Sequence, residues 1–176
     1  LLGKYPSPAT SAHLAMALDG RIARVAPSVA PPPDARALNV DGLFVVPGLI
    51  DAHVHLRDPG FPQKETIETG CRAAAAGGFT SVICMPNTDP PTDCVDVVAW
   101  ISQRAKIADA RVYVVACATN GMAGEALTDT TALLSEDVVG FSDDGLPIES
   151  DALMRALLER SSQSGFVVCP HVEDFR

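Results

Sequence analysis

Five apolar runs recur along most of the chain, and segments of helical length separate them. The runs lie at residues 43–55, 79–86, 111–118, 137–143 and 166–172. Successive runs begin roughly 30 residues apart, which is the length of one strand, one helix and their connections. Each run is almost continuously hydrophobic, as expected for a parallel strand that is buried on both faces of a sheet. The chain from about residue 44 onward is therefore predicted to be an α/β fold.

The intervening segments carry helix signals. They lie at residues 64–78, 94–109, 128–136 and 150–165. The first is rich in alanine and stops at Gly77 and Gly78, and the last has a capping residue at Ser150 and a stop at Gly165. A (β/α)8 barrel and a doubly wound open sheet both fit this alternation. No glycine-rich phosphate loop follows the first strand, which disfavours a dinucleotide-binding sheet.

The chain ahead of these units has a different pattern of short strands and turns. Residues 14–28 predict two strands around the hairpin signal Asp19-Gly20. A proline-rich loop follows, and residues 36–48 predict another short strand, with a turn at Asp41-Gly42. These features predict a small β region ahead of the main domain.

Polar residues cluster where the predicted strands end. His53 and His55 are two positions apart, so on a strand both point to the same face, and two adjacent imidazoles suit a divalent cation such as zinc. Asn87, Asp144 and His171 follow three later strands. In a barrel the carboxyl ends of the strands meet at one face, where barrel enzymes build their sites. Convergence of these side chains predicts a metal site at that face.

Composition restricts the partners. The formal net charge is −9 and the sequence pI is about 4.7, which argues against nucleic acid and anionic membranes as partners. No apolar run reaches the roughly 18 residues of a membrane span, and no signal peptide is evident. The five cysteines are scattered and form no CxxC pair. This pattern is typical of buried thiols in a reducing compartment and favours a cytoplasmic location.

Four segments together carry a family resemblance. They are "PGLIDAHVHLRDPG", "KETIETGCRAAAAGGFTSVICMPNT", "FSDDG" and "HVED". Over about residues 15–176 the chain resembles the amidohydrolase superfamily and, more narrowly, the class I dihydroorotases of pyrimidine biosynthesis. The resemblance implies a (β/α)8 TIM-type barrel of which about five βα units are present. It also divides the chain into a partial N-terminal β-sandwich segment, residues 1–46, and an incomplete barrel domain of a metal-dependent hydrolase, residues 47–176.

The resemblance also implies an activity and its residues. The activity is zinc-dependent hydrolysis of a cyclic amide, the reversible interconversion of dihydroorotate and N-carbamoyl-L-aspartate. His53 and His55 would bind the more buried of one or two zinc ions, Asp144 would bridge two ions, and His171 would bind the second. Arg57 and Asn87 would hold the substrate carboxylate, in keeping with the match between a guanidinium fork and a carboxylate. Asp143, which alternation directs away from Asp144, is left with a supporting or turn-stabilising role.

Two further expectations follow from the family pattern. Another histidine ligand and the catalytic aspartate of the family lie on later strands, beyond residue 176, so the catalytic residue is not assigned and the chain alone is expected to be inactive. Asp58 stands where the family more often has glutamate, with little expected consequence.

Alternative functions remain open. Hydantoinases and allantoinases usually bridge two metals with a carboxylated lysine, and the corresponding strand here carries "FSDDG" without lysine. A second alternative is a non-catalytic dihydroorotase-like subunit that scaffolds aspartate transcarbamoylase. Such scaffolds tend to lose metal ligands, whereas His53, His55, Asp144 and His171 are all retained. The resemblance leaves two protein partners open besides the small-molecule substrate: a second copy of the chain in a homodimer, and aspartate transcarbamoylase.

Overall fold

The computed structural model describes residues 13–16, 21–31, 33–41, 43–134 and 138–173. The chain divides into two compact units, Leu1–Val46 and Pro47–Arg176. Each unit is described by itself.

The first unit contains one small antiparallel sheet. Strand β1, His13–Met16, pairs with β2, Ile22–Ala26, so the two predicted hairpin strands are present. The predicted turn at Asp19-Gly20 lies outside the described residues. The further strand predicted within residues 36–48 is wrong: the described residues there form no strand and are exposed, with no neighbouring strand to pair with.

The second unit contains a five-stranded sheet in which every pairing is parallel. Its strands are β3 Leu49–Val54, β4 Phe79–Cys84, β5 Arg111–Ala116, β6 Val138–Phe141 and β7 Val167–Val168. Their order in the sheet is the order in the sequence. In a doubly wound sheet the strand order reverses at a switch point, where the chain returns to the middle of the sheet. The strand order here does not reverse, as in a (β/α) barrel. The predicted α/β fold is confirmed.

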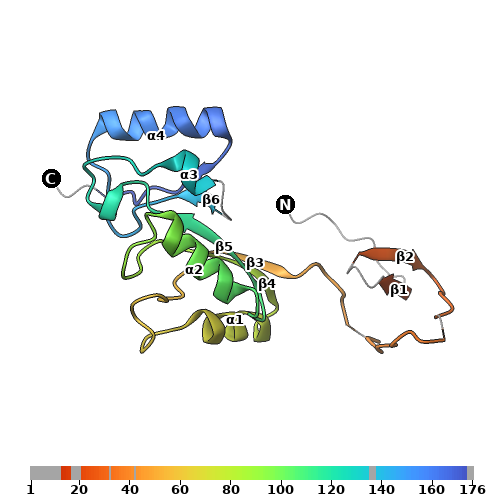
Figure 1. The fold of residues 1–176 in the computed structure, drawn as a ribbon. Coiled ribbons are helices and arrows are strands. Elements are labelled where there is room, and N and C mark those ends of the chain that lie inside the picture. The colour runs from red at the N-terminus through yellow and green to blue at the C-terminus, as the bar shows by residue number, and fades with distance from the viewer. Residues whose placement is uncertain (1–12, 17–20, 32, 42, 135–137, 174–176) are drawn as a thin grey trace. The chain divides into compact units, whose positions relative to one another are not determined.

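Strands and helices alternate along the second unit, so that one helix precedes each strand after β3 (Figure 1). The helices are α1 Ile67–Ala76, α2 Val95–Ala105, α3 Thr130–Leu134 and α4 Asp151–Ser164, with a short 3-10 turn, η1, at Asn120–Met122. The caps predicted for α4 are present. The Ser150 hydroxyl accepts a hydrogen bond from Leu153 N, and Gly165 ends the helix with φ of 77°.

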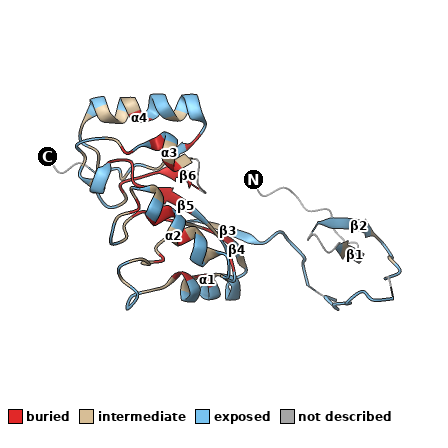
Figure 2. Cartoon of the chain, in the orientation of Figure 1, coloured by how far each residue is buried: buried red, intermediate tan, exposed pale blue. Residues whose placement is uncertain are grey.

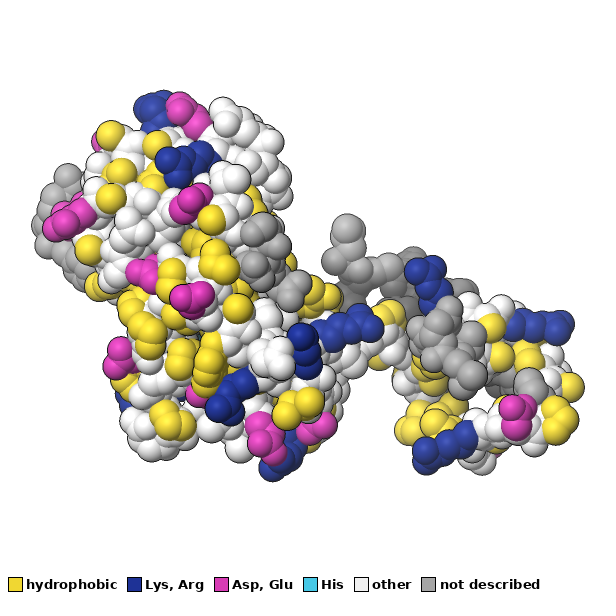
Figure 3. Space-filling model, viewed as in Figure 1, with side chains coloured by type: hydrophobic (Ala, Val, Ile, Leu, Met, Phe, Trp, Pro, Cys, Tyr) yellow, Lys and Arg dark blue, Asp and Glu magenta, His cyan; other side chains and the backbone are white. Residues whose placement is uncertain are grey.

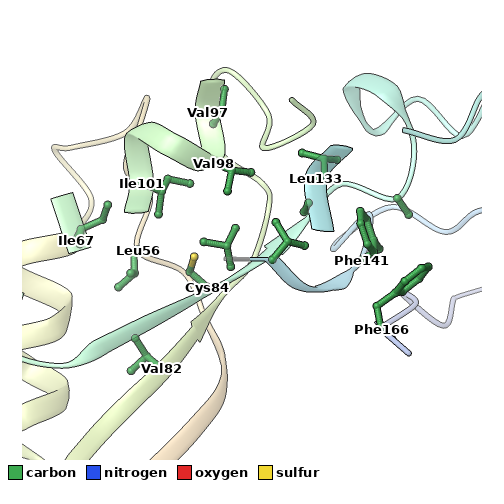
Figure 4. Packing of buried hydrophobic residues seen from close by; sticks show 14 of the residues in the cluster. Leu56, Ile67, Val82, Cys84, Val97, Val98, Ile101, Leu133, Phe141 and Phe166 are labelled. Carbon is green, nitrogen blue, oxygen red and sulfur yellow. The ribbon is translucent and has the colours of Figure 1, made fainter. Parts of the chain in front are cut away.

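The hydrophobic core lies between these helices and the sheet. Figure 2 shows the buried residues gathered along β5, β6 and the helices beside them, while β3 is largely exposed. Phe141 and Phe166 pack edge to face with ring centroids 4.7 Å apart, and Val98, Ile101 and Leu133 approach the sheet from α2 and α3 (Figure 4). Burying an aromatic or aliphatic side chain of this size contributes about 1.5–3 kcal/mol. The core therefore fixes β4, β5 and β6, whereas β3 is held by its parallel pairing with β4.

The surface, the helix lengths and the cysteines are three further features of the structure. Acidic and basic side chains are scattered among hydrophobic and neutral ones on the face of the second unit seen in Figure 3. The longest helix in the described part of the chain, α4, has 14 residues, and none there is long and apolar enough to cross a membrane. Burial raises the pKa of the Cys84 thiol to about 12 and also raises the pKa of Cys71 and Cys117. These three thiols are free and buried, so they behave as small hydrophobic side chains.

Candidate metal centre

The candidate residues lie at the carboxyl ends of four parallel strands. His53 is in β3 and His55 directly follows it. Asn87 lies three residues after Cys84, the end of β4, Asp144 three residues after the end of β6, and His171 three residues after the end of β7. Because the strands are parallel, all of these positions share one edge of the sheet. The topology therefore places them where the sequence predicted a site.

Hydrogen bonds continue past the strand ends and hold these segments in register. Met85 N donates to Val54 O over 2.9 Å, and Ser142 N donates to Ala116 O over 2.9 Å. The Ser142 hydroxyl also donates to Cys169 O over 2.5 Å, which ties the end of β6 to the segment that leads to His171. Backbone that lies outside regular strands is thus still fixed around the candidate residues.

His53 and His55 point in the same direction. Their rings pack edge to face with centroids 5.2 Å apart and an interplanar angle of 74°. The His53 side chain is 55% exposed and that of His55 is 30% exposed. This is the arrangement that strand alternation predicts for residues two positions apart.

The Asp144 carboxylate faces both imidazoles. Its Oδ1 lies 3.4 Å from His53 Nε2, and its Oδ2 lies 3.6 Å from His55 Nε2. The ligand atoms of these three residues all lie within 4.8 Å of one another. Residues from β3 and from the end of β6, about 90 positions apart in sequence, thus form one cluster of nitrogen and oxygen donors.

The neighbouring Asp143 has different partners. The residue is 2% exposed, and its Oδ1 accepts hydrogen bonds from Ala118 N at 2.9 Å and Thr119 N at 3.0 Å. Its Oδ2 accepts from the Thr119 hydroxyl. Asp143 therefore joins the end of β6 to the end of β5. Thr119 was not singled out from the sequence, because a threonine after a strand gives no sign of such a partner.

Asn87 lies between His55 and Asp144. Its Oδ1 is 2.9 Å from His55 Nδ1, and its Nδ2 donates to Asp144 Oδ2 over 2.9 Å. The sequence resemblance assigned Asn87 to the substrate and gave no sign of this link. The amide contacts two of the three clustered donor residues, and its assignment to the substrate stays a prediction.

Arg57 lies in the loop that follows β3, two residues beyond His55. Its backbone has φ of 59°, a conformation uncommon outside glycine, and its carbonyl accepts from Phe61 N over 2.8 Å. Its side chain is half-buried, and no carboxylate in the described ranges lies within ion-pairing distance of it. The guanidinium is thus available to an external anion.

The loops that carry Arg57 and Asn87 are held together at Gly60. Asp89 N donates to Pro59 O over 3.1 Å, and a Cβ at Gly60 would overlap the Asp89 backbone. Gly60 also has φ of 104°, which side chains rarely adopt. Close approach of the two loops therefore requires glycine here.

His171 is apart from the cluster. Its Nε2 lies 2.8 Å from Glu173 Oε2, and it is not among the donors that cluster with Asp144 in the described part of the chain. The structure therefore brings together His53, His55 and Asp144, with Asn87 bridging two of them, and leaves His171 on the adjacent strand end.

The cluster fits the donor chemistry of zinc. Zinc is bound by histidine nitrogens at about 2.0–2.1 Å and carboxylate oxygens at about 2.0–2.2 Å, almost always in tetrahedral geometry at structural sites. Ligand atoms at the corners of such a tetrahedron are separated by about 3.4 Å. His53 Nε2 lies 3.4 Å from Asp144 Oδ1 and His55 Nε2 lies 3.6 Å from Asp144 Oδ2, so each nitrogen is near this spacing from a different oxygen of the same carboxylate.

Comparison with known proteins identifies the family of the chain. The family described as "Dihydro-orotase-like" matches residues 42–175. A dihydroorotase of Anaeromyxobacter dehalogenans (strain 2CP-C) is 47% identical over 157 residues, covering 89% of this chain and 36% of the relative. A dihydroorotase of Geobacter sp. (strain M21) is 44% identical over 171 residues, covering 96% of this chain and 40% of the relative.

The solved structure of L-hydantoinase (dihydropyrimidinase) from Arthrobacter aurescens superposes with a TM-score of 0.75 at 22% identity, covering 89% of this chain and 36% of that one. At this identity the likeness concerns the fold. The chain spans 36 and 40% of the length of the two dihydroorotases above. Because the family match covers most of its residues, the chain belongs to the dihydroorotase-like family.

Proposed function

We propose that the chain supplies part of the active site of a zinc-dependent dihydroorotase, which interconverts dihydroorotate and N-carbamoyl-L-aspartate in pyrimidine biosynthesis. The observation that carries this proposal is the cluster of His53, His55 and Asp144 at the strand ends of a dihydroorotase-like chain. The coarser activity, hydrolysis of a cyclic amide, is supported by the names of the relatives in sequence.

The residues divide the work of such a reaction. His53, His55 and Asp144 hold a zinc ion, and His171 contributes to a second ion if two are bound. A bound zinc ion polarises a carbonyl and lowers the pKa of a water into the neutral range. Arg57, from the β3 loop, holds the substrate carboxylate and so sets the ring amide at a fixed position relative to the cluster.

The alternatives lack a supporting observation of their own. Hydantoinases usually bridge two metals with a carboxylated lysine. In this chain the side chain that faces both histidines is the carboxylate of Asp144, not a lysine. A scaffold without catalysis has no need for clustered donor atoms, and the cluster is intact. The hydantoinase likeness concerns the fold.

A pair of substrates that differ by one group tests the proposed function. Dihydrouracil is dihydroorotate without its carboxylate. With the full-length protein, kcat/KM for dihydroorotate is expected to exceed that for dihydrouracil by about 30- to 5,000-fold, equivalent to about 2–5 kcal/mol for a desolvated charge pair. The assay monitors ring opening as a decrease in the absorbance of the ring amide. It is carried out before and after a chelator has removed the metal. Equal use of both substrates, hydrolysis that resists chelation, or no turnover would refute the proposal.

The role of Arg57 follows from the same pair of substrates. Arg57→Ala is expected to lower kcat/KM for dihydroorotate by about 30- to 5,000-fold, because the charge-assisted pair with the carboxylate is lost. The rate with dihydrouracil should hardly change. Arg72→Ala is a matched control, since that arginine pairs with Glu68 on the exposed side of α1. An equal loss with both substrates would assign Arg57 to the fold instead of the carboxylate.

A further inference from the structure

Asn87 joins the ends of three strands, and one of these, β6, does not neighbour the other two in the sheet. It follows β4, whereas His55 follows β3 and Asp144 follows β6. Strands β3 and β6 are separated by β4 and β5 in the sheet order. One half-buried amide thus spans the distance between two donor residues, with contacts of 2.9 Å on each side.

The chemistry of these contacts fixes the orientation of the amide. A carboxylate only accepts hydrogen bonds, so the Asn87 atom that faces Asp144 is the nitrogen. The atom that faces His55 is then the oxygen, which only accepts. His55 must therefore carry a proton on Nδ1, and its neutral ring then presents the Nε2 lone pair. Nε2 is the atom that lies 3.6 Å from Asp144 Oδ2, inside the cluster.

We propose that Asn87 is a positioning residue that holds His55 in the Nδ1–H tautomer and orients Asp144, so that both present ligand atoms to one divalent cation. This inference rests on the proposed function, because it concerns the same site. Histidines that bind metals almost always donate their other N–H to an oxygen that fixes the ring, and loss of that partner typically weakens metal binding by about 10- to 100-fold. Here the oxygen is that of an amide whose nitrogen also restrains a second donor residue.

The proposal makes a prediction that a contact with substrate alone does not. In the absence of any substrate, Asn87→Ala in the full-length protein is expected to weaken zinc binding by about 10- to 100-fold, measured by competition with a chromophoric chelator. Thr88→Ala is the matched control. The Thr88 hydroxyl bonds to Pro90 O and Thr92 within the same loop and does not contact the cluster, so this variant should bind zinc like the parent.

A second readout needs no metal. Nitrogen-15 NMR of the histidine rings in the metal-free protein is expected to show the Nδ1–H tautomer for His55 in the parent. That signature should be lost in Asn87→Ala and kept in Asn87→Asp, which retains an acceptor for Nδ1–H. The aspartate variant also covers the case in which the alanine variant does not fold.

The outcomes separate the two proposals. Unchanged zinc affinity in Asn87→Ala, with only a higher KM for dihydroorotate, would overturn the positioning role and leave Asn87 as a substrate contact. Equal weakening by Thr88→Ala would assign the effect to the loop and would also overturn it. If the parent bound no divalent cation, the proposed function would fail, and the tautomer measurement would still decide whether Asn87 orients His55.

Discussion

Exchanging His53 and His55 together for alanine in the full-length protein is expected to remove the more buried metal ion and to lower kcat by about 1,000-fold or more. Both imidazoles face Asp144, and their Nε2 atoms are 3.4 and 3.6 Å from its oxygens, so the variant leaves one of three clustered donors. Loss of several kcal/mol of transition-state stabilisation by a metal corresponds to a rate reduction of this size.

Elemental analysis of purified protein measures the first effect and the hydrolysis assay the second. The control exchanges Gln103 and Lys106, which hydrogen bond to each other at the exposed end of α2. Both imidazoles are partly exposed, so the histidine variant should keep the circular dichroism spectrum of the parent. Unchanged metal stoichiometry in the histidine variant would contradict the assignment.

The order of strands and helices could be predicted because it depends on local pattern. Apolar runs of strand length, helix formers and glycine stops recur at the spacing of βα units, and all five strands and four helices of the second unit are present. The limits of the strands were less predictable. Strand β3 begins at Leu49, although the apolar run begins at residue 43, because residues 43–48 have no strand to pair with in the described part of the chain.

The third strand predicted in the first unit shows the same limit. Residues 36–48 have a composition that suits a strand, but a strand is stabilised by its neighbours in a sheet, and the local sequence does not reveal those neighbours.

The sequence predicted which residues gather at the strand ends better than it predicted the contacts between them. Alternation placed His53 and His55 on one face and separated Asp143 from Asp144. The Asn87 link depends on three side-chain conformations from distant segments, so no local pattern encodes it.

The two neighbouring aspartates are expected to respond in opposite ways to the same chemical change. Asp144→Asn should lower metal content and reduce kcat by about 1,000-fold or more, since the variant removes the charge that faces both imidazoles. It should destabilise the metal-free protein less than Asp143→Asn does, because the Asp144 carboxylate is 15% exposed and accepts one hydrogen bond, from Asn87, whereas that of Asp143 accepts three. Asp143→Asn should reduce kcat by about 10- to 100-fold at most.

Stability should show the reverse ranking. The buried Asp143 carboxylate accepts two backbone N–H groups and the Thr119 hydroxyl, and an amide of the same shape cannot accept from all three with equal strength. Hydrogen bonds to a charged group contribute about 1.5–3 kcal/mol, so Asp143→Asn should destabilise the metal-free protein by about 1–3 kcal/mol in urea unfolding. Asp109→Asn, an exposed change in the loop before β5, is the control for charge alone. If Asp143→Asn emptied the metal site while Asp144→Asn destabilised the fold, the two carboxylates would have exchanged roles and the alternation assigned after β6 would be wrong by one residue.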